Sequence, residues 1–212
     1  MIVIPIFLSI LALVSGALTI VAKYRKLQRL EFIFKPLTLF WIILIALLAQ
    51  DPISTTYQRI ILLALLASLA GDMYLLLPDK FIQGLISFLI AHCFYIVAFS
   101  SEIDHYSQVW YLIPFVVYGG VILWWLWPYL GPMKFPVVFY VCIILIMASQ
   151  AGNRWLQASQ NTSAILALAG AYLFLASDSV LAVERFRGTW RSAPFWVLTT
   201  YFAAQWLLAL SI

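Results

Sequence analysis

Long apolar runs follow one another along almost the whole chain, and they constrain its fold more than any other feature. A helix needs about 20 mostly apolar residues to cross a bilayer. Eight runs approach or reach that length, at residues 2–22, 36–50, 58–77, 81–100, 109–127, 135–152, 162–183 and 194–211. The second is short and the sixth is modest, so seven spans remain an alternative. The connections are short, and we predict one transmembrane domain over residues 1–212.

The composition excludes a water-soluble domain. The chain is 65% hydrophobic and 9% charged, whereas about a quarter of the residues of a soluble domain are charged. Nine Trp and eleven Tyr suit the aromatic belts found at membrane interfaces. Because the apolar runs are continuous, not alternating, they favour helices over a membrane β-barrel. We therefore predict an all-α, polytopic integral membrane protein, and we expect no binding to nucleic acid.

The basic residues predict an orientation. Of the 12 Lys and Arg, ten fall in alternate loops, namely Lys23, Arg25, Lys26, Arg29, Lys35, Lys80, Lys134, Arg185, Arg187 and Arg191. The positive-inside rule places those loops in the cytoplasm and the N-terminus outside. Arg59, Arg154, Glu102, Asp104 and His105 then lie outside. The short loops and the charge bias fit a bacterial inner membrane, although a protein of the endoplasmic reticulum would look the same.

Two aspartates lie inside apolar runs, in the segments Gly71-Asp72 and Ser177-Asp178. An ionisable group at membrane depth is costly and marks a functional-site hypothesis. Asp72 lies six residues before Pro78 and Asp178 seven before Arg185, which is roughly 9–10 Å in a helix. Both are therefore expected at one level, in the cytoplasmic half of the membrane. If they approach each other, one keeps its proton while the other is ionised, which equips the site for general acid–base chemistry.

Other polar residues are candidates for the same site. His92 lies midway along its run, with Tyr95 nearly one turn later on the same side. Lys35 ends a basic loop at the membrane boundary, where it either snorkels or binds a phosphate. Tyr201 and Gln205 either bind a neighbouring helix or join the site. Each also has a purely structural reading, in which it fills a packing position.

Several familiar sites are not supported by the residues. With only two histidines, a three-His zinc site is excluded, and we expect no metal. There is no Gly-x-Ser-x-Gly elbow of a serine lipase and no glycine-rich phosphate loop. Nothing specific supports Ser68 or Ser177 as a nucleophile, and the small Ser177 instead suits close helix packing.

A faint internal repeat links the two halves of the chain. Matching pairs lie four runs apart: Lys35-Pro36 with Lys134-Phe135-Pro136, Ala70-Gly71-Asp72 with Ala176-Ser177-Asp178, and Ala91-His92 with Ala204-Gln205. They indicate a possible parallel 4+4 repeat, with the site where the two halves meet.

At these residues the chain resembles the lysoplasmalogenase family, the YhhN-like multi-pass membrane proteins. The resemblance rests on Lys35-Pro36, Gly71-Asp72, Ala91-His92 with Tyr95, Gly170 to Phe174, Ser177-Asp178 with Leu181-Ala182 and Arg185-Phe186, and Tyr201 with Ala204-Gln205. It implies hydrolysis of the vinyl ether bond of lysoplasmalogens, which are lysophospholipids, without a metal or organic cofactor. It does not give the oligomeric state or the headgroup preference.

This implied chemistry suits two aspartates. A vinyl ether resists base but is cleaved by acid, so one carboxyl would protonate the alkenyl chain while the other activates water. Asp72 and Asp178 are expected to share these roles. Lys35 would bind the substrate phosphate, and His92, Tyr95, Ser177, Tyr201 and Gln205 would orient groups around them. Two alternatives stay open, a small proton-coupled transporter and a structural protein whose aspartates serve assembly.

Overall fold

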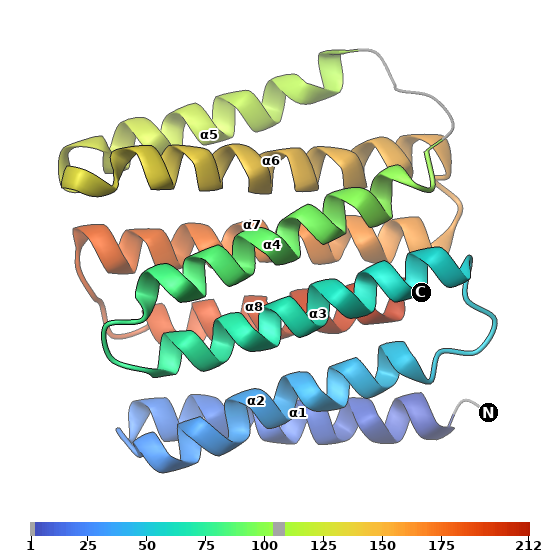
Figure 1. Ribbon diagram of the computed structural model, residues 1–212, viewed down its shortest axis with the longest axis horizontal. Helices are drawn as coiled ribbons and strands as arrows, with labels where there is room; N and C mark the ends of the chain where they lie inside the picture. The colour runs from blue at the N-terminus through green and yellow to red at the C-terminus, as the bar shows by residue number, and fades with distance from the viewer. Residues whose placement is uncertain (1–2, 104–108) are drawn as a thin grey trace.

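Eight helices long and apolar enough to span a membrane make up the part of the chain that the computed structural model describes, residues 3–103 and 109–212 (Figure 1). They are α1 (Val3–Tyr24), α2 (Gln28–Leu47), α3 (Thr55–Leu76), α4 (Phe81–Ser100), α5 (Ile113–Leu126), α6 (Lys134–Gln157), α7 (Thr162–Arg187) and α8 (Ala193–Leu210). Three short 3₁₀ segments flank α5: η1 (Val109–Leu112), η2 (Trp127–Tyr129) and η3 (Gly131–Met133). The prediction of an all-α, eight-span protein is confirmed. Asp104 and His105 lie outside the described residues.

Helix α2 begins eight residues earlier than we predicted, at Gln28 instead of Pro36. We took the proline for a helix start, because its ring leaves the carbonyl four residues earlier without a helical donor. The structure keeps Pro36 inside the helix. Before it, the Lys23 ammonium lies 3.0 Å from the Glu31 carboxylate and fastens the first turn of α2 to the end of α1. Lys35 is therefore a helical residue and not, as we expected, the end of a loop.

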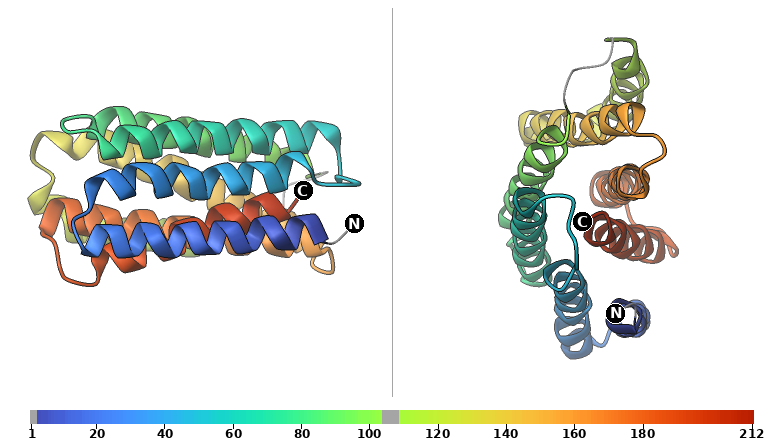
Figure 2. Two further views of the ribbon diagram at one scale, coloured as in Figure 1. Left: turned by 90° about the horizontal axis from the view of Figure 1, so that it is seen from below. Right: turned by 90° about the vertical axis from the view of Figure 1, so that its right-hand side faces the viewer.

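The helices pack mainly as antiparallel neighbours. The closest pairs are α1 with α2, α3 with α4, and α7 with α8. Seen end-on, α2, α3 and α4 line one side of the bundle, α1, α8 and α7 line the other, and α6 joins the two sides (Figure 2). These helices thus form a ring, and α5 lies outside it and packs chiefly on α6.

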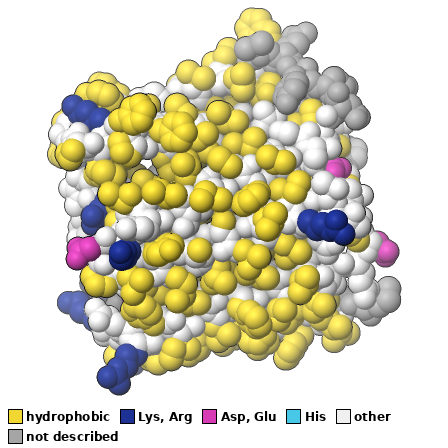
Figure 3. Space-filling view, viewed as in Figure 1, with side chains coloured by type: hydrophobic (Ala, Val, Ile, Leu, Met, Phe, Trp, Pro, Cys, Tyr) yellow, Lys and Arg dark blue, Asp and Glu magenta, His cyan; other side chains and the backbone are white. Residues whose placement is uncertain are grey.

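The outer surface is that of a membrane protein. Hydrophobic side chains cover the middle of the face seen in Figure 3, and charged side chains lie toward its two ends. Large apolar residues are exposed on every span, as expected where lipid replaces water around the helices. Together with the eight spans, this makes the protein an integral multi-pass membrane protein.

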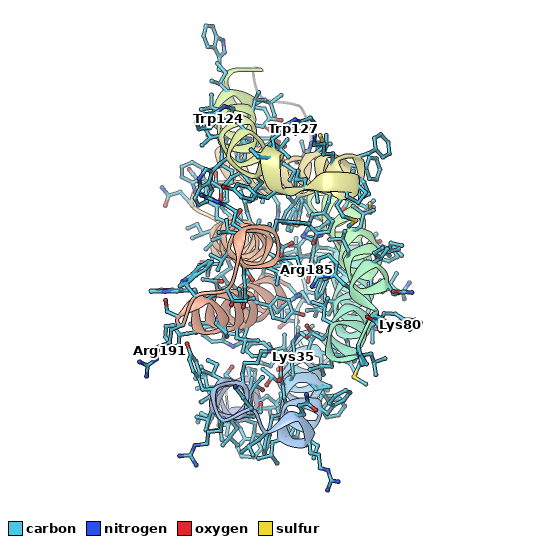
Figure 4. The ribbon with its side chains drawn as sticks, turned by 90° about the vertical axis from the view of Figure 1, so that its left-hand side faces the viewer. Lys35, Lys80, Trp124, Trp127, Arg185 and Arg191 are labelled. Atoms are coloured by element: carbon cyan, nitrogen blue, oxygen red, sulfur yellow. The ribbon has the colours of Figure 1, made fainter. Side chains whose placement is uncertain are left out.

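Basic residues gather at one end of the bundle. Lys35 and Arg185 lie toward the middle of that end, Lys80 and Arg191 lie toward its margin, and Trp124 and Trp127 mark its α5 side (Figure 4). Both chain termini lie at the opposite end (Figure 1). The structure thus has the two-ended charge distribution that the sequence predicts, while the assignment of this end to the cytoplasm stays a prediction.

Candidate active site between the two halves of the bundle

Asp72, on α3, is buried and held from two sides. The Lys35 ammonium, from α2, lies 3.0 Å from its Oδ1. The Tyr201 hydroxyl, from α8, donates a hydrogen bond of 2.8 Å to its Oδ2. Both partners are donors, and one is a cation, so these contacts suit an ionised carboxylate.

Asp178, on α7, has a different set of partners. The Tyr140 hydroxyl, from α6, donates a hydrogen bond of 2.5 Å to its Oδ2. The Nε2 atom of His92, from α4, lies 3.7 Å from the same oxygen. Within the described residues, no Lys or Arg nitrogen lies within 4.0 Å of this carboxyl. The two aspartates therefore differ in the charge beside them.

The hydrogen bonding of His92 decides its tautomer. Its Nδ1 lies 2.5 Å from the Phe88 carbonyl oxygen, which can only accept a hydrogen bond, so Nδ1 carries the hydrogen. In the neutral ring Nε2 is then an acceptor, and it is buried without a hydrogen-bond partner among the described atoms. This acceptor faces Asp178. At 3.7 Å the two atoms are close but beyond hydrogen-bond distance, so a small approach of the side chains would let a protonated Asp178 donate to Nε2.

Tyr95 and Gln205 form a second layer behind Asp72. The Tyr95 hydroxyl donates a 2.6 Å hydrogen bond to Oε1 of Gln205, and Gln205 lies beside the Tyr201 hydroxyl that binds Asp72. His92 and Tyr95, which the sequence places on one side of α4, thus have different partners: His92 faces Asp178, and Tyr95 reaches Asp72 only through Gln205 and Tyr201. Ser177 donates to the Val197 carbonyl at 3.0 Å and ties α7 to α8.

Both aspartates line the same cavity, which has a volume of about 570 Å³. Besides Asp72 and Asp178, Lys35, Ser177 and Tyr201 line it. His92, Tyr95 and Gln205 lie behind its wall and are fully buried. Charged groups also line the cavity at the basic end of the bundle, namely Lys23, Glu31, Glu184 and Arg185. The cavity is therefore lined by both acidic and basic side chains.

A smaller cavity of about 60 Å³ adjoins the first and is lined almost only by apolar side chains from α3 to α7. The two cavities share Leu75, Phe81, Phe88, Asp178 and Leu181. The Asp178 side chain is 13% exposed, so it borders a polar space on one side and an apolar space on the other.

Two residues near Asp178 escaped the sequence analysis as site residues. Tyr140 is one of eleven tyrosines, and no spacing distinguishes it before α6 is placed beside α7. Arg185 was counted only as a basic loop residue, yet it lies on α7 with its guanidinium 4.5 Å from the centre of the Phe81 ring.

The site residues do not form a metal-ligand set. Within residues 3–103 and 109–212, no three His, Cys, Asp or Glu side chains come together in a group that could hold a metal ion. Next to the two aspartates, the described residues offer the neutral imidazole of His92, the hydroxyls of Tyr140 and Tyr201 and the ammonium of Lys35; Arg185 adds a guanidinium to the same cavity.

Comparison with known proteins gives consistent results. Residues 30–212 match the YhhN family. An uncharacterised membrane protein YhhN of Escherichia coli O157:H7 is 29% identical over 200 residues, which cover 93% of this chain and 94% of the relative. Human lysoplasmalogenase TMEM86B is 33% identical over 156 residues, 73% of this chain and 64% of the relative. Bovine lysoplasmalogenase TMEM86A is 29% identical over 185 residues, covering 83% and 74%. No solved structure matches this chain.

Proposed function

This chain belongs to the YhhN family, and we propose that it is a membrane hydrolase that cleaves the vinyl ether bond of lysoplasmalogens. The products would be a fatty aldehyde and a glycerophospho-ethanolamine or -choline. Relatives named lysoplasmalogenase support this proposal. The observation that carries it is the pair of carboxyls with unlike partners in one cavity, Asp72 beside a cation and Asp178 beside a neutral acceptor.

Asp178 is the general acid in this proposal. It would give its proton to the β-carbon of the alkenyl group, which leaves an oxocarbenium ion at the α-carbon. Three observations support this choice: the described residues place no cation beside it, the nearby Nε2 of His92 is a neutral acceptor at 3.7 Å, and apolar space adjoins it. Protonation of carbon is slow, and a positioned acid accelerates such steps by about 10²–10⁴.

Asp72 is the base that activates water. Water would bond through its oxygen to the α-carbon while its proton passes to Asp72, giving a hemiacetal. The hemiacetal then collapses: its hydroxyl proton passes to the ionised Asp178, the bond to the glycerol oxygen breaks, and that oxygen takes the proton that Asp72 had received from water. One water is consumed, and both carboxyls return to their starting forms. The Tyr201 hydroxyl, on Oδ2, would hold Asp72 in position throughout.

Basic groups that line the large cavity at the basic end of the bundle would bind the substrate phosphate. Lys35 lines the cavity and has donors beyond its contact with Asp72. Arg185 also lines the cavity, and among the described residues no carboxylate pairs with it. Guanidinium groups bind phosphate oxygens in a bidentate manner, so Arg185 is the stronger candidate. We place the site in the cytoplasmic half of a bacterial inner membrane.

The transporter alternative is less well supported. It requires that the aspartates be reached from both ends of the bundle. Between the site and the opposite end, α3 and α8 fill the interior with fully buried apolar side chains, among them Ile61, Ala64, Leu65 and Leu208.

The test is aldehyde release from 1-alkenyl-lysophosphatidylethanolamine by purified protein in detergent, with and without EDTA. Run in D₂O, the reaction should place one deuterium on the carbon next to the aldehyde, because that carbon takes its proton from an exchangeable group. A saturated 1-alkyl analogue should give no product. Asp178→Asn should elute as folded protein and release little aldehyde. Asp72→Asn should be less stable because it leaves Lys35 unpaired, and the part of it that elutes as folded protein should also release little aldehyde. Folded wild-type protein that yields no aldehyde with either headgroup, across pH, would refute the proposal.

A further inference from the structure

We propose that the apolar cavity between α4, α5, α6 and α7 binds the first carbons of the substrate's hydrocarbon chain, so that the vinyl ether lies at Asp178. This inference rests on the proposed hydrolase function and deepens it. It assigns the larger cavity to the glycerophosphate part and the smaller to the chain, and it makes α5 the outer wall of the chain site.

The contrast between the two cavities supports this assignment. The large cavity has ionic side chains from four helices. In the small one, Tyr118, Tyr140, Asp178 and Ser179 supply the only polar side chains among the described lining residues. Two of these groups are engaged with each other, since the Tyr118 hydroxyl donates to the Ser179 hydroxyl at 2.8 Å. An amphiphilic substrate matches such a pair of spaces end to end.

The junction of the cavities is where the chemistry is proposed. Leu75, Phe81, Phe88 and Leu181 belong to both linings together with Asp178. The vinyl ether is the point at which the lipid changes from hydrocarbon to glycerol. If that point lies at the junction, the alkenyl β-carbon comes within reach of the proposed acid.

The size of the small cavity limits how much chain it holds. One water needs roughly 10–15 Å³, so a cavity of about 60 Å³ holds only a few groups of methylene size. The rest of a long chain must continue outside it. Tyr118, which is 38% exposed, lies at the outer edge of this lining, so the remaining carbons would pass into the surrounding lipid. Selectivity should therefore depend on the carbons next to the vinyl ether more than on total chain length.

Helices α5 and α6 pack closely where they line the small cavity. A Cβ added at Gly119 would come within 2.3 Å of Leu145 Cδ1, whereas at Gly120 it would meet nothing within 4 Å. The glycine therefore allows α5 to approach α6 at the cavity. Ile122, three residues further along α5, lines the same space.

The experiment fills the cavity and compares two substrates. Ile122→Trp should lower kcat/KM for a hexadecenyl lysophospholipid by about tenfold or more, because buried methylene contacts are lost. It should leave a propenyl analogue within about twofold, since that chain ends close to the vinyl ether. Val121→Trp is the matched control: Val121 is 56% exposed on the outer face of α5, and neither substrate should be affected.

Two outcomes would overturn the inference while leaving the hydrolase intact. These are unchanged turnover of the long substrate by Ile122→Trp, and an equal loss for both substrates. A second measurement does not need turnover: a non-hydrolysable 1-alkyl lysophospholipid with a diazirine on an early chain carbon should label α5, α6 or α7 around the cavity. Ile122→Trp should reduce that labelling, and labelling only elsewhere would also overturn it. Absence of aldehyde from the wild type would instead count against the proposed function.

Discussion

At the scale of single residues, the two aspartates are distinguished by one neighbour. Lys35 and Asp72 form a buried ion pair with 10% and 1% of their side chains exposed. Asp178 has a phenol and an imidazole in the corresponding places. The same substitution should therefore have different consequences for stability at the two positions, whatever it does to turnover.

Asp72→Asn should destabilise the protein by about 3–5 kcal/mol, because it leaves the Lys35 ammonium buried without its carboxylate. Asp178→Asn should cost less, since it leaves no ammonium or guanidinium unpaired. Adding Lys35→Met to Asp72→Asn should restore much of the loss. Unfolding in mixed micelles measures all of these variants in one assay. Equal losses for the two Asn variants would show that the ion pair contributes nothing specific.

Arg185→Gln should raise KM for a lysophospholipid by about tenfold to a hundredfold and change kcat little, since a charged phosphate contact contributes about 1.5–3 kcal/mol. Arg187→Gln is the matched control. Arg187 stacks on Trp125 and Tyr129 and does not line the large cavity. Steady-state kinetics at several substrate concentrations separates the two constants. If both variants raise KM alike, the effect is one of general surface charge.

The sequence was informative at this scale wherever a residue type was unusual for its surroundings. Asp72, Asp178 and His92 attract notice because ionisable groups inside apolar sequence are rare, and Lys35 because it ends a basic run at the membrane boundary. In the structure Lys35 and both aspartates line one cavity, and His92 lies next to Asp178. Tyr140 could not be recognised in the same way, because tyrosine is common in membrane helices. Only the packing of α6 against α7 brings its hydroxyl to Asp178. The roles of all these residues stay predictions.

At the scale of helices, close approach depends on particular glycines. Gly170 of α7 faces α8, where an added Cβ would come within 2.8 Å of Leu208 Cγ and 3.1 Å of the Ala204 carbonyl oxygen. The Leu208 side chain can rotate away from an added methyl group, but the Ala204 carbonyl can move away only if α8 itself shifts. Since α8 carries Tyr201 and Gln205, this contact also sets the position of the group that binds Asp72.

Gly170→Ala should therefore lower stability by about 1–3 kcal/mol through overpacking and reduce turnover by displacing Tyr201. Gly120→Ala, on α5 with open space around the new methyl, should be neutral or slightly stabilising, because alanine favours helix by up to about 1 kcal/mol. Thermal unfolding in detergent compares the two directly. A Gly170→Ala protein as stable as Gly120→Ala would mean that α7 and α8 adjust without cost.

Helix positions were predictable because each span must be apolar over a fixed length. Boundaries were less so, and the start of α2 shows why. The residues before Pro36 include the charged Arg29, Glu31 and Lys35 among apolar ones, and charges so close to the basic residues after residue 22 are typical of a loop. Their pairing partners, Lys23 for Glu31 and Asp72 for Lys35, lie on other helices. Tertiary contacts decided this boundary, and local sequence does not contain them.

At the scale of the whole molecule, the packing follows the plan of two related halves for six of the eight helices. Helix α2 contacts α3 as α6 contacts α7, and α4 contacts α6 as α8 contacts α2. The carboxyls follow the same plan. Asp72 on α3 contacts Lys35 from the preceding helix and Tyr201 from α8, the last helix of the other half. Asp178 on α7 likewise contacts Tyr140 from the preceding helix and faces His92 from α4, the last helix of the other half. Helices α1 and α5 depart from it, since α1 closes the ring while α5 lies outside.

The orientation of the molecule decides from which side its cavity is reached. The large cavity is lined by Lys23, Lys35 and Arg185, at the end where the basic residues gather. The positive-inside rule predicts that this end faces the cytoplasm and that the end holding both termini lies outside. Alkaline phosphatase, which is active only outside the inner membrane, should be active when fused after Ile212 and inactive when fused in the α3–α4 connection at Asp79. The single substitution Lys80→Glu should not reverse this pattern, because nine other basic residues favour the same orientation. The opposite fusion pattern would place the basic end outside, and the substrate would then have to come from the outer leaflet.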